Sequence, residues 1–116
     1  MLNIYHNPRC RKSREALEFL INNNINFEVI NYLKDHLTEV KLSSLINKLK
    51  IKPIDLIRKN ESIWKDNYKR KELSDNEILQ ILITNPKLIE RPIIETNDVA
   101  IIARPIENLI NFFTKK

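Results

Sequence analysis

The sequence contains no glycine, a single cysteine and only two histidines among its 116 residues. Without glycine, the chain cannot form the glycine-rich loops that hold phosphates in many nucleotide-binding proteins. One cysteine excludes an intramolecular disulfide, and His6 and His36 are too few and too far apart to form a metal site with it. No apolar run approaches the length of a membrane span. Any bound anion must therefore be held by side chains and helix-end amides.

The composition is that of a soluble globular protein, with 42% hydrophobic and 30% charged residues. The length predicts one domain over residues 1–116. The net charge is +5, but the lysines are scattered and no nucleic-acid-binding motif is present, so we expect an ordinary basic surface and neither nucleic-acid nor membrane partners. We expect a cytoplasmic location, because no secretory signal is visible and a free thiol is easiest to keep reduced in the cytosol. We also expect a monomer.

A basic, polar run surrounds the cysteine at residues 5–14 (YHNPRCRKSR) and is the most informative stretch of the chain. An apolar strand over 2–5 leads into the run, and a helical pattern over 13–23 leaves it. Cys10 therefore lies where a strand passes to a helix N-terminus. The helix dipole and the nearby arginines favour the thiolate, which is the nucleophilic form of the side chain. The pattern predicts a reactive cysteine rather than a buried core cysteine.

The elements expected along the chain follow the order β-α-β, helical insert, β-β-α. Strands are predicted over 2–5, 27–30, 93–95 and 99–102, and the first helix is expected to carry Leu17, Leu20 and Ile21 on one face. In the middle, Thr38 and Ser74 are candidate N-caps, with a capping box at Ser74, and a proline opens a short helix at 53–58. Another proline, at position 105, opens the last helix.

This order predicts the α/β fold class: a thioredoxin-like fold with a mixed central sheet and a helical insert at about 37–90. In that fold the reactive cysteine follows the first strand, which agrees with the position of Cys10. A cis-proline beside the cysteine is also expected, and Pro92 is the candidate because cis bonds occur almost only before proline. Trp64 and Tyr68 lie four positions apart and are interpreted as a packing pair.

Four short blocks of sequence resemble those of the glutaredoxin-coupled arsenate reductases, often called the ArsC family. They are YHNPxCxxSR at 5–14, LIRKNE at 56–61, ERPI at 90–93 and ARP at 103–105. Each block is weak alone, but the four occur in family order and span the chain. The resemblance implies a thioredoxin-like fold with a helical insert, which agrees with the element order above.

The resemblance also implies roles for individual residues. Cys10 would be the nucleophile that attacks arsenate, and His6 would assist the thiolate. The residues that would hold the oxyanion are Arg58, Arg91, Arg104, Ser13 and Arg14. Glutathione as co-substrate and glutaredoxin would supply the electrons, with no bound cofactor. Arginine suits this task because its planar fork of donors matches tetrahedral oxyanions.

Two alternatives stay open at this stage. One is a thiol-dependent oxidoreductase of the same fold with another substrate, because a fold does not determine a substrate. The other is a non-enzymatic stress regulator that binds RNA polymerase; such regulators typically carry a second cysteine where this chain has Ser13. Arg9, Arg11 and Lys12 are bulkier than the family pattern leads us to expect, and they could tune or crowd the site.

Overall fold

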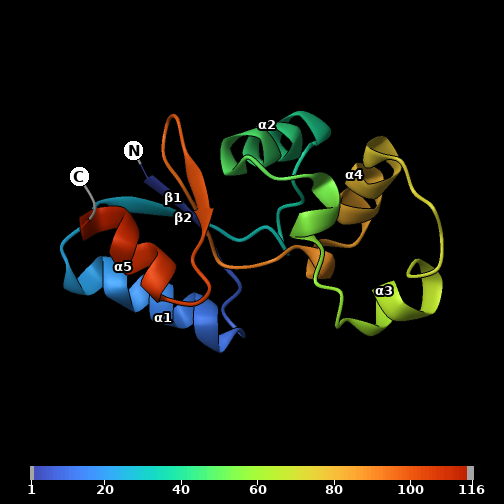
Figure 1. Cartoon of the computed structure of the whole chain (residues 1–116). Helices are drawn as coiled ribbons and strands as arrows, with labels where there is room; N and C mark the ends of the chain where they lie inside the picture. Colours follow the sequence, from blue (N-terminus) through green and yellow to red (C-terminus); the bar gives the residue numbers. More distant parts are fainter. Residues whose placement is uncertain (1, 115–116) are drawn as a thin grey trace. The chain divides into compact units, whose positions relative to one another are not determined.

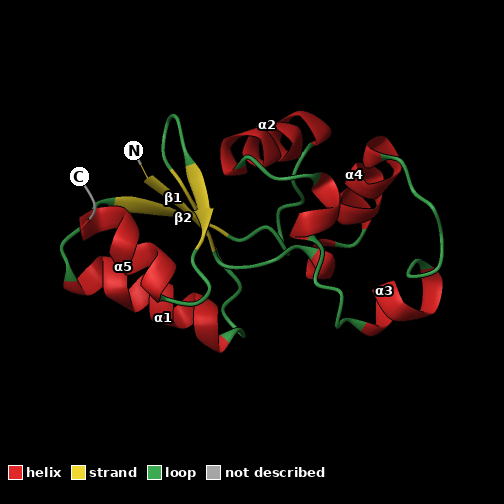
Figure 2. Cartoon of the chain, viewed as in Figure 1, coloured by secondary structure: helices red, strands yellow, loops and turns green. Residues whose placement is uncertain are grey.

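Two units divide the chain in the computed structural model, which describes residues 2–114 (Figure 1). The first unit, here called the sheet unit, consists of the described residues up to Asp35 and from Arg91 onward. The second, the helical unit, is His36–Glu90. Figure 2 shows all the strands in the sheet unit and only helices and loops in the helical unit.

The sheet has four strands in the order β2-β1-β3-β4. Their bounds are β1 Leu2–Tyr5, β2 Phe27–Ile30, β3 Ile93–Glu95 and β4 Ala100–Ile102. Strand β1 runs parallel to β2 and antiparallel to β3, which in turn forms a hairpin with β4. The predicted mixed sheet and element order are confirmed.

Helices α1 (Arg11–Asn22) and α5 (Glu107–Thr114) belong to the sheet unit and contribute to its core. Alternate strand residues and one stripe of each helix form that core, as expected for half-buried strands and amphipathic helices. Its buried members are Leu2, Ile4, Ala16, Leu20, Ile94, Ala103 and Leu109. Ile21, on the predicted apolar face of α1, is 56% exposed. The buried positions of α1 are Ser13, Ala16 and Leu20, and a step of one residue turns the side chain about 100° away from that stripe.

The helical unit contains α2 (Glu39–Leu49), α3 (Ser62–Asn67) and α4 (Asp75–Thr84), with 3₁₀ turns η1 (Pro53–Leu56) and η2 (Pro86–Leu88). Helix α4 packs against α2 and both 3₁₀ turns. Thr38 caps α2, and Ser74 forms the predicted capping box with Glu77. The turn opened by Pro53 ends at Leu56, two residues earlier than predicted. Trp64 is buried and stacks against Tyr68 at 6.0 Å, which confirms the packing pair.

The lack of glycine has a visible consequence at two helix ends. Asn24 (φ 56°) follows α1 and Lys50 (φ 57°) ends α2, so both occupy the left-handed region that glycine usually fills. Asparagine tolerates this region better than lysine does. Within residues 2–114, no helix is both long enough and apolar enough to cross a membrane.

Candidate active site

The register of the sheet brings three distant segments to one end of it. Tyr5 at the end of β1 pairs with Ile93 at the start of β3, and Ile93 pairs with Ile102 at the end of β4. The loop that follows β1, the residues before β3 and the residues after β4 therefore share this end. A hydrogen bond from the Ala103 amide to the Pro92 carbonyl (2.9 Å) joins the last two segments. Cys10, Arg91 and Arg104 all lie on these segments.

Cys10 occupies the N-cap position of α1 and is partly exposed. The pKa of its thiol is lowered from the ordinary value of 9.0. Burial of the sulfur opposes this shift, but the Ser13 amide, the Arg91 guanidinium and the Lys12 amide outweigh it by hydrogen bonding to and attracting the thiolate. The predicted reactive cysteine thus has a structural basis: helix-end amides on one side and an arginine on the other.

Ser13 is fully buried and connects the loop to the first turn of α1. Its Oγ accepts a hydrogen bond from the Asn7 amide (3.0 Å) and lies 2.9 Å from His6 Nδ1. Asn7 in turn accepts the Arg9 amide through Oδ1 (3.0 Å). The Ser13 hydroxyl therefore faces the interior of the loop, while its amide faces the sulfur.

His6 is buried at the end of β1, where its amide donates to the Ile30 carbonyl (2.9 Å). Burial and the positive charge of Arg14 lower the pKa of the imidazole, against a smaller opposite effect of the Ser13 hydrogen bond. The ring is therefore neutral at pH 7, and its described contact is with Ser13.

The arginines occupy different environments. The Arg91 guanidinium bonds to Cys10, and the Arg91–Pro92 peptide is cis, as predicted. Arg104 is half-buried, and its Nη1 atom is buried without a hydrogen-bond partner among residues 2–114. Arg14 is exposed, and its Nη1 donates to the Pro8 carbonyl (3.1 Å) across the loop.

Arg58 lies in the helical unit, just after η1. Its guanidinium is 3.6 Å from both Glu61 and Glu90, and its amide donates to the Leu88 carbonyl (2.7 Å). The oxyanion role predicted for Arg58 stays a prediction.

Two further features escaped the sequence analysis. Asn7 belongs to the motif at 5–14, but no role was predicted for it. Its hydrogen bonds to Ser13 and Arg9, which organise the loop, exist only in the folded chain. Glu95, 1% exposed on β3, accepts hydrogen bonds from Tyr5 Oη (2.7 Å) and Asn3 Nδ2 (3.2 Å). Burial and this bond raise the pKa of Tyr5 above its ordinary value, so the phenol stays protonated and donates. A glutamate next to two isoleucines inside a predicted strand was the available signal.

Taken together, the fold and the site are those of a thioredoxin-like protein with one activated thiol and an arginine beside it. The chain belongs to the ArsC family, whose model matches residues 5–112. Among proteins of known sequence, the chain is 39% identical over 109 residues to Escherichia coli YfgD, described as uncharacterized, covering 92% of both chains.

Other relatives carry the name arsenate reductase. The chain is 34% identical over 110 residues to one from Neisseria meningitidis serogroup A, covering 93% of this chain and 94% of that one. Among solved structures, an arsenate reductase from Vibrio cholerae superimposes with a TM-score of 0.89 at 37% identity, over 95% of each chain. The predicted thioredoxin-like fold and the family resemblance are both confirmed.

Proposed function

We propose that this protein reduces arsenate to arsenite, with Cys10 as the nucleophile. The observation that carries the proposal is the Cys10–Arg91 pair: a thiol whose pKa is lowered next to a guanidinium that can hold an oxyanion. Family membership and relatives named arsenate reductase support arsenate as the substrate.

The first step forms a bond between the Cys10 sulfur and arsenic. The thiolate attacks arsenate, and one arsenate oxygen leaves as hydroxide or water. Arg91 offers its donors to the remaining oxygens, and the buried Nη1 of Arg104 is available as a further donor. Arg58 and Arg14 are proposed as additional cations for the oxyanion, as the family resemblance implies.

The electrons come from two external thiols, because the chain has no second cysteine. Glutathione displaces a second oxygen and forms an As–S bond. A glutaredoxin thiolate then attacks the glutathione sulfur, forming a mixed disulfide, and the electron pair of the broken bond reduces arsenic(V) to arsenic(III). Hydrolysis of the Cys10–arsenic bond releases arsenite. In this proposal the protein acts as a cytoplasmic monomer without a bound cofactor.

His6 is proposed to act through Ser13 rather than by direct proton transfer. Its ring and the Asn7 amide both contact the Ser13 hydroxyl, and they thereby hold the Ser13 amide against the sulfur. The role of Ser13 in anion binding would then come from its amide, since its hydroxyl is engaged inside the loop.

The test is arsenate-dependent oxidation of NADPH, coupled through glutathione reductase in the presence of glutathione and glutaredoxin. The wild-type protein should turn over, and activity should require both glutathione and glutaredoxin. The nearly isosteric variant Cys10→Ser should keep the fold, checked by circular dichroism, and lose all measurable turnover. Turnover retained in Cys10→Ser would contradict the proposed role of Cys10 as the nucleophile. NADPH oxidation that does not depend on arsenate in the wild type would contradict arsenate as the substrate.

A further inference from the structure

A lysine-lined pocket lies within the helical unit and is not used in any step proposed for Cys10. Its volume is about 850 Å³, within the range of pockets that hold small molecules. Asp75 is the one acidic residue that lines it. The lining lysines are Lys52, Lys59, Lys65, Lys69 and Lys71.

The positive charge of this pocket exceeds the negative charge of its lining, since five lysines share it with the single carboxylate of Asp75. Among residues 2–114, none of the five ammonium groups forms an ion pair with a carboxylate. Lys71 has a different partner, since its Nζ lies 5.8 Å from the centre of the Tyr68 ring. Several like charges around one concave surface focus a positive potential into it, which favours an anion of more than one charge.

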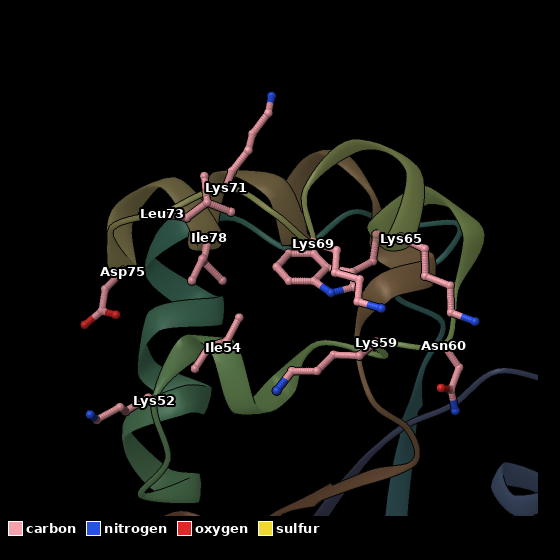
Figure 3. Close-up of a pocket in the computed structure, with 11 residues that line it drawn as sticks. Lys52, Ile54, Lys59, Asn60, Lys65, Lys69, Lys71, Leu73, Asp75 and Ile78 are labelled. Carbon is pink, nitrogen blue, oxygen red and sulfur yellow. The ribbon is translucent and has the colours of Figure 1, made fainter.

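The lysines differ in how they face the pocket. In Figure 3 the ammonium groups of Lys59 and Lys69 lie toward the middle of the view, whereas those of Lys52 and Lys71 point outward at its edges. Lys59 follows η1 and Lys69 follows α3, so the two charges come from different segments. These two side chains are therefore the best placed to bind an anion inside the pocket.

Non-polar side chains complete the lining. Trp64 and Ile78 are buried and give it a fixed wall, while Ile54 and Leu73 are partly exposed and can contact a ligand. A single carboxylate would satisfy one ammonium group, whereas a di- or triphosphate concentrates several charges in a compact group. The non-polar wall, in turn, suits a ligand that also carries an apolar or aromatic part.

We propose that this pocket binds a small phosphorylated molecule that carries a non-polar or aromatic group. The phosphates would lie between Lys59 and Lys69, and the non-polar part would contact Ile54 and Leu73. The proposal is independent of arsenate reduction, because every residue in it belongs to 52–78 and none is assigned to the thiol site.

The experiment is an NMR titration of the ¹⁵N-labelled protein in magnesium-free buffer with three probes: ATP, inorganic tripolyphosphate and adenosine. ATP combines charge with a planar body, tripolyphosphate has only the charge, and adenosine has only the body. We expect ATP to bind most tightly, with amide shifts at 52–78 and an affinity that falls as salt rises. Equal affinities for ATP and tripolyphosphate would contradict the proposed contact between the pocket and a non-polar group. Amide shifts confined to residues 6–14 would contradict binding in this pocket.

A double variant then tests the two lysines. Lys59→Gln with Lys69→Gln should weaken ATP binding about tenfold, because two charge contacts of modest strength are lost. Lys34→Gln removes the same charge from an exposed position in the sheet unit and should leave the affinity unchanged. Equal weakening in both proteins would show non-specific attraction and overturn the proposal. Tighter binding of a poly-glutamate peptide than of ATP would overturn it in favour of an acidic protein partner.

Discussion

The two units of the chain place their polar groups in opposite ways. All four buried polar residues of the described chain belong to the sheet unit, namely His6, Asn7, Ser13 and Glu95. Among the described residues of the helical unit, every buried side chain is hydrophobic, and five lysines line a pocket open to solvent.

This difference separates two ways of handling charge. In the sheet unit, buried hydrogen bonds hold a small number of atoms in fixed positions around the Cys10 sulfur, as a reaction requires. In the helical unit, flexible ammonium groups create a potential without fixed geometry, which suits attraction and binding. Substitutions of buried polar groups in the sheet unit should therefore act on chemistry and stability, and substitutions of the pocket lysines in the helical unit should act on salt-dependent binding.

After Cys10 itself, the largest effect is expected at Arg91. Arg91→Ala should lower kcat/KM for arsenate by about tenfold to a hundredfold, because a charge-assisted contact of about 1.5–3 kcal/mol is lost. It should also raise the pKa of Cys10, measured as the midpoint of alkylation rate against pH. Arg91→Lys should recover only part of the activity, since lysine keeps the positive charge but lacks the planar, two-pronged donor group of arginine. An unchanged Cys10 midpoint in Arg91→Ala would contradict the proposed contact.

Tyr5→Phe tests the buried polar network of the sheet unit through stability. Removing the phenol leaves the buried Glu95 carboxyl with one donor fewer, which should cost about 1–3 kcal/mol of unfolding free energy in urea titrations. Tyr68→Phe in the helical unit is the matched control. Tyr68 is partly exposed, so we expect a change below about 0.5 kcal/mol. Similar losses in the two variants would remove the contrast between the units.

The pH dependence of stability should report on His6. Its folded-state pKa lies below the ordinary value of 6.5, so the unfolded chain binds a proton more readily than the folded protein does. Stability should therefore be complete above that value and fall as the pH drops below it. His6→Gln should flatten this fall relative to the wild type in urea titrations from pH 7 to pH 5. His36→Gln, at an exposed position, should not. A wild-type free energy of unfolding that rises as the pH falls from 7 to 5 would contradict the lowered pKa of His6.

The smallest effect is expected at the end of α2. Lys50→Gly relieves the left-handed conformation of a residue with a β-carbon, and it should stabilise the protein by up to about 1 kcal/mol. Asn24→Gly is the comparison in the sheet unit. Because asparagine tolerates this conformation, its gain should be smaller, as thermal unfolding of both variants can show. A larger gain at Asn24 would contradict the explanation.

Much of the fold followed from local patterns. The alternation and length of the apolar runs predicted β1, β2 and β3, and the caps at Thr38 and Ser74 follow from side-chain chemistry close in sequence. The apolar face at Leu17, Leu20 and Ile21 does not coincide with the buried stripe of α1, because burial depends on how the helix packs. Local patterns are thus reliable for the existence of an element and weaker for its exact face.

The site residues that lie close together in sequence could be predicted, whereas contacts between residues far apart in sequence could not. The basic run around Cys10 predicted an activated thiol from local sequence. Arg91 could be linked to Cys10 only by the family resemblance, and the pairing of β1 with β3 explains why the two lie together. The bond between Tyr5 and Glu95 likewise joins residues far apart in sequence. The lysines of the pocket were interpreted as scattered surface charges, since their common cavity exists only in the folded helical unit.

The pairing of Tyr5 with Ile93 also has a consequence for the newly made chain. Cys10 leaves the ribosome before Arg91 and strand β3 do, because synthesis proceeds from the N-terminus. Until β3 pairs with β1, the sulfur lacks the guanidinium that favours its thiolate. Activation of the thiol by Arg91 is therefore coupled to completion of the sheet, because the thiolate gains this stabilising charge only when β3 is in place.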